Sequence, residues 1–262
     1  MFKFPAKLNA VSGVFVRSFA SVWDGIHSSQ VASLSDSLIQ VDRMDSVIGP
    51  VPKLDSHLAQ AVNDGVIHRA FSVFLFSRDT RALLIQKRCS SKIVFPREWA
   101  NTCCSHPLYI ESEMDNIDGT NKGIKRAASK RLHAELGISN FPLDSFAFKE
   151  KILYRQLSPG GTFGESECDY ILIGEFDREK EPVTPVPDEV EETCWIEPGP
   201  VGSRTKNLRS FLQSENLKGF PPTPWFDLIV QDSQCLEHWW DRLLTDRNFL
   251  KDDYKGSIRS FF

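Results

Sequence analysis

The chain has 262 residues, of which 41% are hydrophobic and 25% are charged, so it is long enough to bury one large core. Its formal net charge of -4, without a long basic run, argues against nucleic acid as a partner. No apolar run is long enough to cross a bilayer, so we expect no membrane partner either.

The N-terminal segment has the composition of an organelle transit peptide. Residues 1–23 contain no acidic residue and carry Lys3, Lys7 and Arg17 among Phe, Val, Ala and Ser. Arg17–Ser21 also resembles a mitochondrial processing site. We therefore expect a mitochondrial protein. The alternative is an ordinary disordered N-terminus on a cytoplasmic or peroxisomal protein.

Residues 24–37 are polar and rich in serine, which predicts a linker. We therefore expect an N-terminal extension over 1–37 and one folded domain over 38–262. The six cysteines show neither a framework spacing nor a Cys-x-x-Cys motif, which indicates free thiols in a reducing compartment.

Runs rich in β-branched and aromatic residues predict the strands of a sheet. These runs are 37–42, 68–76, 82–88, 148–155, 167–174 and 193–196. Turn residues at 78–81 join two of them into a hairpin, and Ser158–Thr162 predicts a turn between two others. We expect Ile48–Pro52 to turn out of the first strand and Pro182–Pro187 to form a connection.

Helical periodicity appears in four segments, namely 57–64, 123–136, 200–217 and a long one over 226–250. Gly137 follows the second segment as a stop signal, and the acidic stretch 111–121 is expected to be a loop. The order of elements predicts an α+β fold, in which helices cover both faces of a mixed central sheet in an α-β-α arrangement.

The stretch Asn101–Pro107 places two thiols and an imidazole within a few residues of one another. Pro107 rules out a continuous helix through it. In an extended segment Cys104 and His106 point the same way, so both side chains are able to serve one cavity. The alternative is a buried, inert thiol pair beside a core histidine.

Two carboxylates, Glu165 and Glu167, lie two residues apart in a predicted strand and so face one side. They repel each other unless a cation or a proton lies between them. His57, His68 and His106 are candidates to join them as metal ligands. The alternatives are a solvated strand edge and structural histidines, because spacing alone does not prove that these residues converge.

Five segments together resemble one known family. They are His68–Ser72, Asn101–Pro107, Ala134–Ile138, Gly164–Leu172 and Thr223–Phe226. In this order they resemble type I isopentenyl-diphosphate Δ-isomerase, a member of the Nudix fold, over a match that runs from about Leu38 to the C-terminal region. The resemblance implies a Nudix-like α-β-α sandwich with an extra N-terminal strand and C-terminal helices.

The helix that carries the Nudix motif is degenerate in this chain. In Lys130–Gly137 only Glu135 remains of the acidic residues that hold the metal ions of a Nudix hydrolase. This loss argues against diphosphate hydrolysis and in favour of the isomerase of isoprenoid and sterol biosynthesis. A Nudix-type diphosphate hydrolase and a catalytically silent binding protein of the same fold are the alternatives.

The resemblance implies two metal sites. His57, His68, His106, Glu165 and Glu167 match the positions that hold a tightly bound divalent ion, which is Mg, Mn or Zn. Glu135 matches a ligand of a second ion, Mg2+, which arrives with the substrate diphosphate and also touches the backbone carbonyl of Cys104.

The resemblance also implies the roles of the catalytic and substrate-binding residues in a monomer that acts on isopentenyl diphosphate. Cys104 and Glu167 match the acid/base pair, with Tyr154 beside the carboxylate, and Trp225 matches the aromatic cover of the hydrocarbon end. The positions around the diphosphate are Lys53, Arg88, Lys92 and Arg131. Without the resemblance, Arg88 and Lys92 would be read as solvated loop charges, Arg131 as a polar-face residue of its helix and Trp225 as core. Two departures precede the thiol, where Arg97 replaces a usual glycine and Ala100 a usual threonine.

Overall fold

The computed structural model describes residues 28–115, 119–214, 217, 219–251, 253 and 256–262. The predicted transit segment 1–23 lies outside this range. Within the described part of the chain, no helix is both long enough and apolar enough to cross a membrane.

A large mixed sheet forms the centre of the molecule. Along its main path the strands follow the order β10-β7-β8-β3-β1-β2, while β4, β5, β6 and β9 pair off this path. Strands β3 and β8 run parallel at the centre of the sheet, and most other pairs are antiparallel. The strands are β1 (Ser37–Val41), β2 (Val47–Pro52), β3 (Ile67–Ser77), β4 (Leu83–Arg88), β5 (Trp99–Ala100), β6 (Cys103–Ser105), β7 (Ala147–Leu157), β8 (Gly164–Phe176), β9 (Val190–Ile196) and β10 (Arg259–Ser260).

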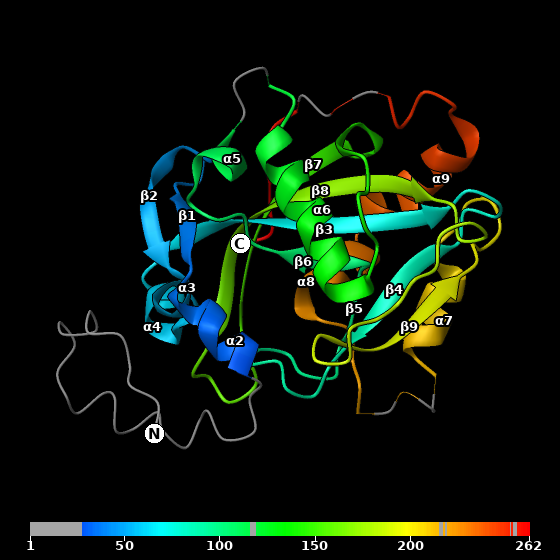
Figure 1. Ribbon diagram of the computed structural model, residues 1–262. Helices are drawn as coiled ribbons and strands as arrows, with labels where there is room; N and C mark the ends of the chain where they lie inside the picture. Colours follow the sequence, from blue (N-terminus) through cyan, green and yellow to red (C-terminus); the bar gives the residue numbers. More distant parts are fainter. Residues whose placement is uncertain (1–27, 116–118, 215–216, 218, 252, 254–255) are drawn as a thin grey trace, which may run out of the picture.

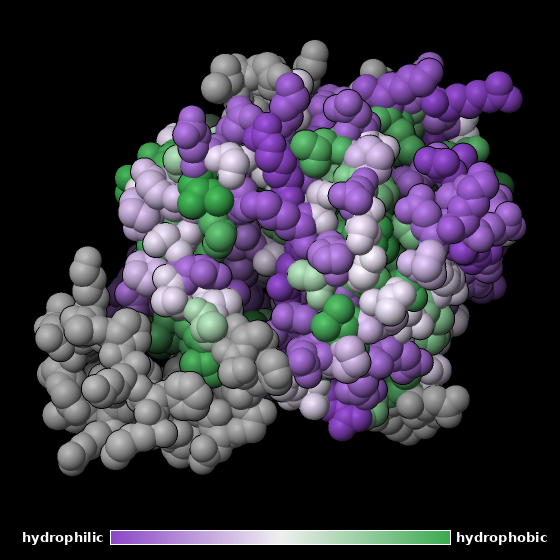
Figure 2. All heavy atoms as spheres, in the orientation of Figure 1, coloured by the Kyte–Doolittle hydropathy of each residue, from purple (hydrophilic) through white to green (hydrophobic). Residues whose placement is uncertain are grey.

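Helices cover both faces of the sheet, which confirms the predicted α-β-α arrangement and the α+β class. Alternate residues of β3 point to opposite faces: Phe71 and Val73 enter a core with α6 (Lys122–Leu136), and Phe74 and Phe76 enter a second core. The second core contains α8 (Pro224–Gln231) and α9 (His238–Thr245). In Figure 1, α6 crosses in front of the sheet while α8 and α9 lie behind it. Figure 2 shows that mainly hydrophilic residues cover the α6 side.

Helix α6 agrees closely with its prediction. Ile124, Ala128 and Leu132 are buried on the side that packs against the sheet. The helix ends at Gly137, which has a φ of 67° and donates its backbone N–H to the carbonyl of His133. A side chain at this glycine would lie 2.8 Å from the carbonyl oxygen of Thr184, so both the backbone angle and the packing require glycine.

Three segments predicted as irregular are ordered into elements. The predicted turn at 48–52 is strand β2, which tolerates Pro50 and Pro52 because it lies at the edge of the sheet. The start of the predicted loop 111–121 forms the short helix α5 (Glu111–Met114). Part of the predicted linker forms α2 (Ser28–Ala32) and the 3-10 turn η1 (Ser33–Ser35).

The predicted helices of the C-terminal third are shorter than their periodicity suggests. Among the described residues of 200–217, the α-helix is limited to α7 (Lys206–Leu212). The predicted helix 226–250 is broken between α8 and α9 by the π-type turn η4 (Ser233–Glu237). At this break Asp232 is extended and its side chain accepts the N–H of Gln234, which competes with helical hydrogen bonding.

Two further predictions are only partly right. The predicted helix 57–64 is two short helices, α3 (Lys53–His57) and α4 (Ala59–Asn63), with an extended Leu58 between them. The predicted β3–β4 hairpin is paired only at Phe76 and Leu83, after which β4 leaves β3 to pair with β5 and β9.

Candidate active site

One cavity of about 420 Å³ gathers most of the predicted site residues. It reaches from α6 to α8 across the start of β8. Its lining includes Lys53, His57, Arg88, Lys92, Cys104, His106, Arg131, Tyr154, Glu165, Glu167 and Trp225. His68 and Glu135, the other two predicted residues, have no exposed surface and do not belong to this lining. Residues more than a hundred positions apart in sequence are thus brought together.

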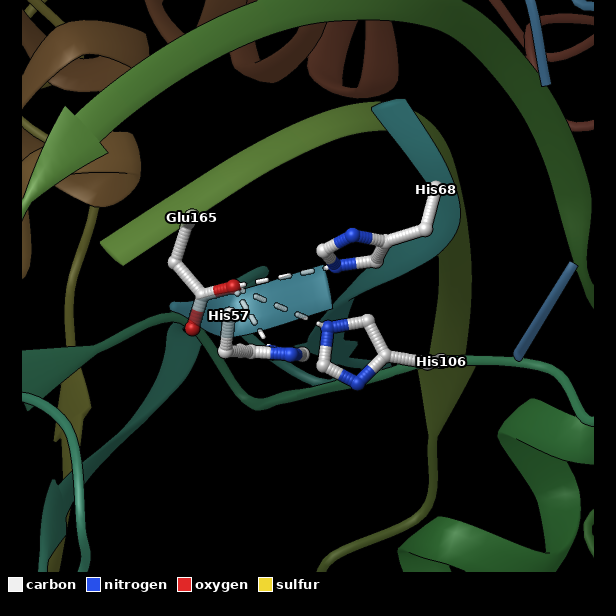
Figure 3. Close-up of side chains that lie close together, drawn as sticks. All are labelled: His57, His68, His106 and Glu165. Atoms are coloured by element: carbon white, nitrogen blue, oxygen red, sulfur yellow. Dashed lines mark ion pairs between the residues drawn. The ribbon is translucent and has the colours of Figure 1, made fainter. Parts of the chain in front are cut away.

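Three imidazoles and one carboxylate point toward one another at the edge of this cavity (Figure 3). One ligand atom from each of His57, His68, His106 and Glu165 lies within 4.8 Å of all the others. Glu165 Oε2 is 3.0 Å from Nε2 of His57, 3.8 Å from that of His68 and 3.9 Å from that of His106. The end of α3, the start of β3, the residue after β6 and the start of β8 each supply one of these side chains.

The hydrogen bonds around this cluster test whether it fits a metal ion. His57 Nδ1 lies 2.7 Å from the carbonyl oxygen of Lys53, which only accepts, so Nδ1 carries a proton. His57 Nε2 therefore faces Glu165 with a lone pair unless a cation or a second proton lies between them. Burial by itself lowers the pKa of His57, but the Glu165 carboxylate raises it above its usual value.

The surroundings of His68 also test whether the cluster fits a metal ion. Both ring nitrogens of His68 are buried without a hydrogen-bond partner, which is costly for a polar group unless something binds it. Nitrogen and carboxylate ligands in this number suit a divalent ion such as Zn2+ or Mn2+. The residues therefore fit a metal, with the Lys53 carbonyl orienting His57 from behind.

Glu167 lies beside the cluster and on the same side of β8 as Glu165, as the two-residue spacing predicts. Its Oε1 is 2.7 Å from His106 Nε2, and its Oε2 accepts a hydrogen bond from the hydroxyl of Tyr154, the residue directly opposite on β7. Burial raises the pKa of Glu167, but the neighbouring His106 and His68 together hold it well below its usual range. Glu167 is thus an oriented, ionised carboxylate.

The two neighbouring cysteines point in opposite directions from β6. Cys103 is fully buried in the core beneath α6, whereas Cys104 and His106 line the cavity, as the extended geometry predicts. Burial raises the pKa of Cys104 to about 12 in spite of Arg88, whose NH1 is 4.0 Å from the sulfur. The cavity therefore presents a protonated thiol in the same space as the Glu167 carboxylate.

Four cations, those of Lys53, Arg88, Lys92 and Arg131, line the cavity. Burial and then repulsion by Arg131 and Lys92 lower the pKa of Lys53 to about 8. Beneath them, Glu135 accepts hydrogen bonds from Gln86 and Arg131 at 3.0 and 2.9 Å. Burial opposes its ionisation, but Arg131 and Lys92, with the hydrogen bond from Gln86, lower the pKa of Glu135 to about 2, so it stays charged.

Trp225 lines the cavity beside α8, where the guanidinium carbon of Arg88 lies 5.5 Å from the centre of its ring. Pro224 begins α8, and the ring of Trp225 lies edge-on to Phe95, with ring centres 5.7 Å apart. Its Nε1 donates to Asn101 Oδ1 at 3.0 Å. Asn101 in turn donates from Nδ2 to the carbonyls of Val73 and Cys103, so one amide orients both the indole and the strand that carries Cys104.

We expect Asn101→Asp to lower the free energy of unfolding by about 3 kcal/mol, because two buried carbonyls would then face a carboxylate that has no donors. The indole contact of Oδ1 is kept in this variant. Asn207→Asp is the matched control, since exposed Asn207 also donates to two carbonyls, and we expect it to cost about 0.5 kcal/mol or less. Urea unfolding measures both, and equal losses would contradict the role given to Asn101.

Arg97, which stands where glycine is usual, keeps the backbone conformation that a glycine would adopt. Arg97 has a φ of 63°, a conformation that suits the glycine expected there. Its guanidinium lies 4.6 Å from the centre of the Phe220 ring and 3.2 Å from Glu191 Oε1, which offsets part of the strain. The loop therefore keeps a left-handed turn before the thiol.

Sequence analysis gave no role to three carboxylates that line this cavity, those of Asp36, Glu113 and Glu189. Glu189, in the turn before β9, binds Lys92 and Arg131. Only the acidic run after the proline-rich connection marks this position, and nothing in that run distinguishes Glu189 from its exposed neighbours.

No family model matches the chain. It is 39% identical over 246 residues to an isopentenyl-diphosphate delta-isomerase of Phaffia rhodozyma, covering 92% of this chain and 90% of that one. It is 36% identical over 220 residues to isopentenyl-diphosphate delta-isomerase 1 of Mus musculus, covering 83% and 90%. Among solved structures, a NUDIX hydrolase from Alicyclobacillus acidocaldarius aligns with a TM-score of 0.42 and 8% identity over 63% of this chain and 90% of that one.

Proposed function

Because this chain belongs to the isopentenyl-diphosphate Δ-isomerase family and converts isopentenyl diphosphate into dimethylallyl diphosphate, we propose that Cys104 and Glu167 are its acid/base pair. The single observation that carries this proposal is that the Cys104 thiol and the Glu167 carboxylate line the same cavity. Four cations and the Trp225 indole line the same cavity.

The reaction needs two proton transfers that balance. One carbon of the double bond gains a proton, a tertiary carbocation forms, and a different carbon loses a proton so that the double bond has moved. An acid and a base on opposite sides of the substrate achieve this. Each group of this kind typically raises the reaction rate by about 100- to 10,000-fold. The protonated thiol of Cys104 and the ionised Glu167 supply one acid and one base.

The His/Glu cluster supports a divalent metal beside this pair. We propose that His57, His68, His106 and Glu165 hold the ion, with Glu167 completing the set, and that the ion is Mg2+, Mn2+ or Zn2+. When bound, it would supply positive charge that orients the Glu167 carboxylate and sets its proton affinity. Glu135 is the ligand we propose for a second Mg2+, which accompanies the diphosphate.

The apolar part of the cavity suits a carbocation. The face of Trp225 is able to stabilise a positive charge by about 2 kcal/mol where water is excluded. Tyr154 keeps Glu167 in one orientation through its hydroxyl hydrogen bond. An aromatic cover also keeps out water, which would trap the cation as an alcohol.

The cationic part of the cavity suits a diphosphate. Arg88 and Arg131 present planar donors that match phosphate oxygens, while Lys53 and Lys92 supply point charges. The hydrolase alternative finds less support, because α6 retains only Glu135 of the acidic residues, and Lys92, Arg131 and Gln86 surround that carboxylate.

We expect deuterium to appear in dimethylallyl diphosphate when isopentenyl diphosphate is turned over in D2O, because one proton comes from a group that exchanges with solvent. A chelator should stop turnover, and adding back the divalent ion should restore it. Mass spectrometry of the product measures the first result and initial rates the second. Release of phosphate without deuterium uptake would instead support the hydrolase.

A further inference from the structure

Glu189 occupies the cationic part of the cavity without an assigned role. Its Oε2 accepts hydrogen bonds from Lys92 Nζ and, at 2.6 Å, from Arg131 NH2. Its Oε1 accepts a hydrogen bond from Gln30 Nε2 at 3.0 Å. The side chain is 13% exposed and lines the cavity, so it holds two of the cations that a diphosphate would bind.

The cations do not need Glu189 to hold them in position. Arg131 already donates from both Nε and NH2 to Glu135 Oε1, at 2.9 and 2.7 Å. Lys92 Nζ is also 3.5 Å from the same oxygen. Glu135 has no exposed surface and is fixed within α6. The buried carboxylate therefore orients the pair, while Glu189 binds the same nitrogens from the cavity side.

The charges explain why a second carboxylate is present. Lys53, Arg88, Lys92 and Arg131 all line one cavity. Burial lowers the pKa of Lys53, and repulsion by Arg131 and Lys92 lowers it further. In the empty protein an ionised Glu189 relieves this repulsion; although burial opposes its ionisation, Lys92 and Arg131 lower its pKa. A diphosphate carries several negative charges on its oxygens, so it binds the same cations more strongly than one carboxylate does.

We propose that Glu189 is a built-in competitor of the diphosphate group: its carboxylate occupies Lys92 and Arg131 until the diphosphate displaces it, and it thereby sets the affinity for substrate. The proposal rests on the proposed function, because it assumes that this cluster binds a diphosphate. Gln30 holds the competitor in place through the other carboxylate oxygen, which links α2 to the cavity.

Titration of the full chain with inorganic diphosphate and Mg2+ in a calorimeter tests this directly. We expect Glu189→Gln to lower the dissociation constant by about tenfold, because the amide no longer competes as an anion for the two cations. KM for isopentenyl diphosphate should fall in the same direction. Gln30→Ala should give a smaller tightening, since it frees Glu189 without removing its charge.

Glu191→Gln is the matched control. It removes one negative charge two residues away, but Glu191 pairs with Lys87 and Arg97 and does not line the cavity. We expect unchanged binding in this variant. Weaker diphosphate binding in Glu189→Gln would overturn the proposal and show that Glu189 positions the cations for the ligand. Unchanged binding would also overturn it and show that Glu189 has no part in binding. Binding of diphosphate without any isomerisation by the wild-type protein would instead overturn the proposed function alone.

Discussion

Replacing Cys104 with alanine should abolish alkene isomerisation while the protein stays folded. The rate should fall at least by the contribution of one acid/base group, which is about 100- to 10,000-fold. No other cysteine is able to replace Cys104, because no second thiol reaches the cavity. Cys103 is adjacent in sequence but lies on the opposite side of β6, in the core beneath α6. Initial rates with isopentenyl diphosphate measure the loss, and thermal unfolding monitored by circular dichroism checks the fold.

Cys194 provides the matched control for this experiment. It is another free, partly buried cysteine, but it lies in β9 and does not line the cavity. Cys194→Ala should therefore keep wild-type rates. Full activity of Cys104→Ala would remove the thiol from the reaction, whatever else the cavity does.

Replacing Glu167 with glutamine should cause a loss of similar size. The amide has the shape of the carboxylate but accepts no proton at neutral pH, so half of the acid/base pair is lost. It should also lower the metal content of the purified protein, because a charged oxygen beside His106 becomes a neutral amide. Initial rates and elemental analysis measure these two effects separately.

Glu175→Gln is the control for Glu167, because it makes the same change on the same strand. Glu175 lies near the end of β8 and pairs with Arg81 at 2.6 Å, away from the cavity. It should leave both the rate and the metal content unchanged. A Glu167→Gln protein that turns over at the wild-type rate would refute the assignment of Glu167 as acid or base.

Local sequence patterns determined the elements whose burial repeats regularly. The alternation in 68–76 and the run in 167–174 belong to β3 and β8, and the apolar face over 123–136 with its glycine stop belongs to α6. These patterns predict the elements because one face, or both faces, of the helix or strand is buried along its whole length. The pairing of Glu165 with Glu167, and of Cys104 with His106, follows from the same two-residue period.

Elements that depend on residues distant in the sequence could not be predicted from local periodicity. Strand β2 contains Pro50 and Pro52 and exists because β1 supplies its hydrogen bonds on one side only. The break between α8 and α9 depends on how the Asp232 side chain competes with the helix backbone. Periodicity detects burial, and it does not detect which backbone partner is available.

The sequence by itself determined the chemistry that this protein carries, because its motifs hold the thiol, the carboxylates and the imidazoles in fixed local spacings. Only the tertiary structure decided that they meet. The parallel pairing of β3 with β8 sets His68 opposite Glu167, and the antiparallel pairing with β7 sets Tyr154 opposite the same carboxylate. Such registers join residues far apart in the chain, and they are fixed by packing over the whole sheet rather than by any local spacing.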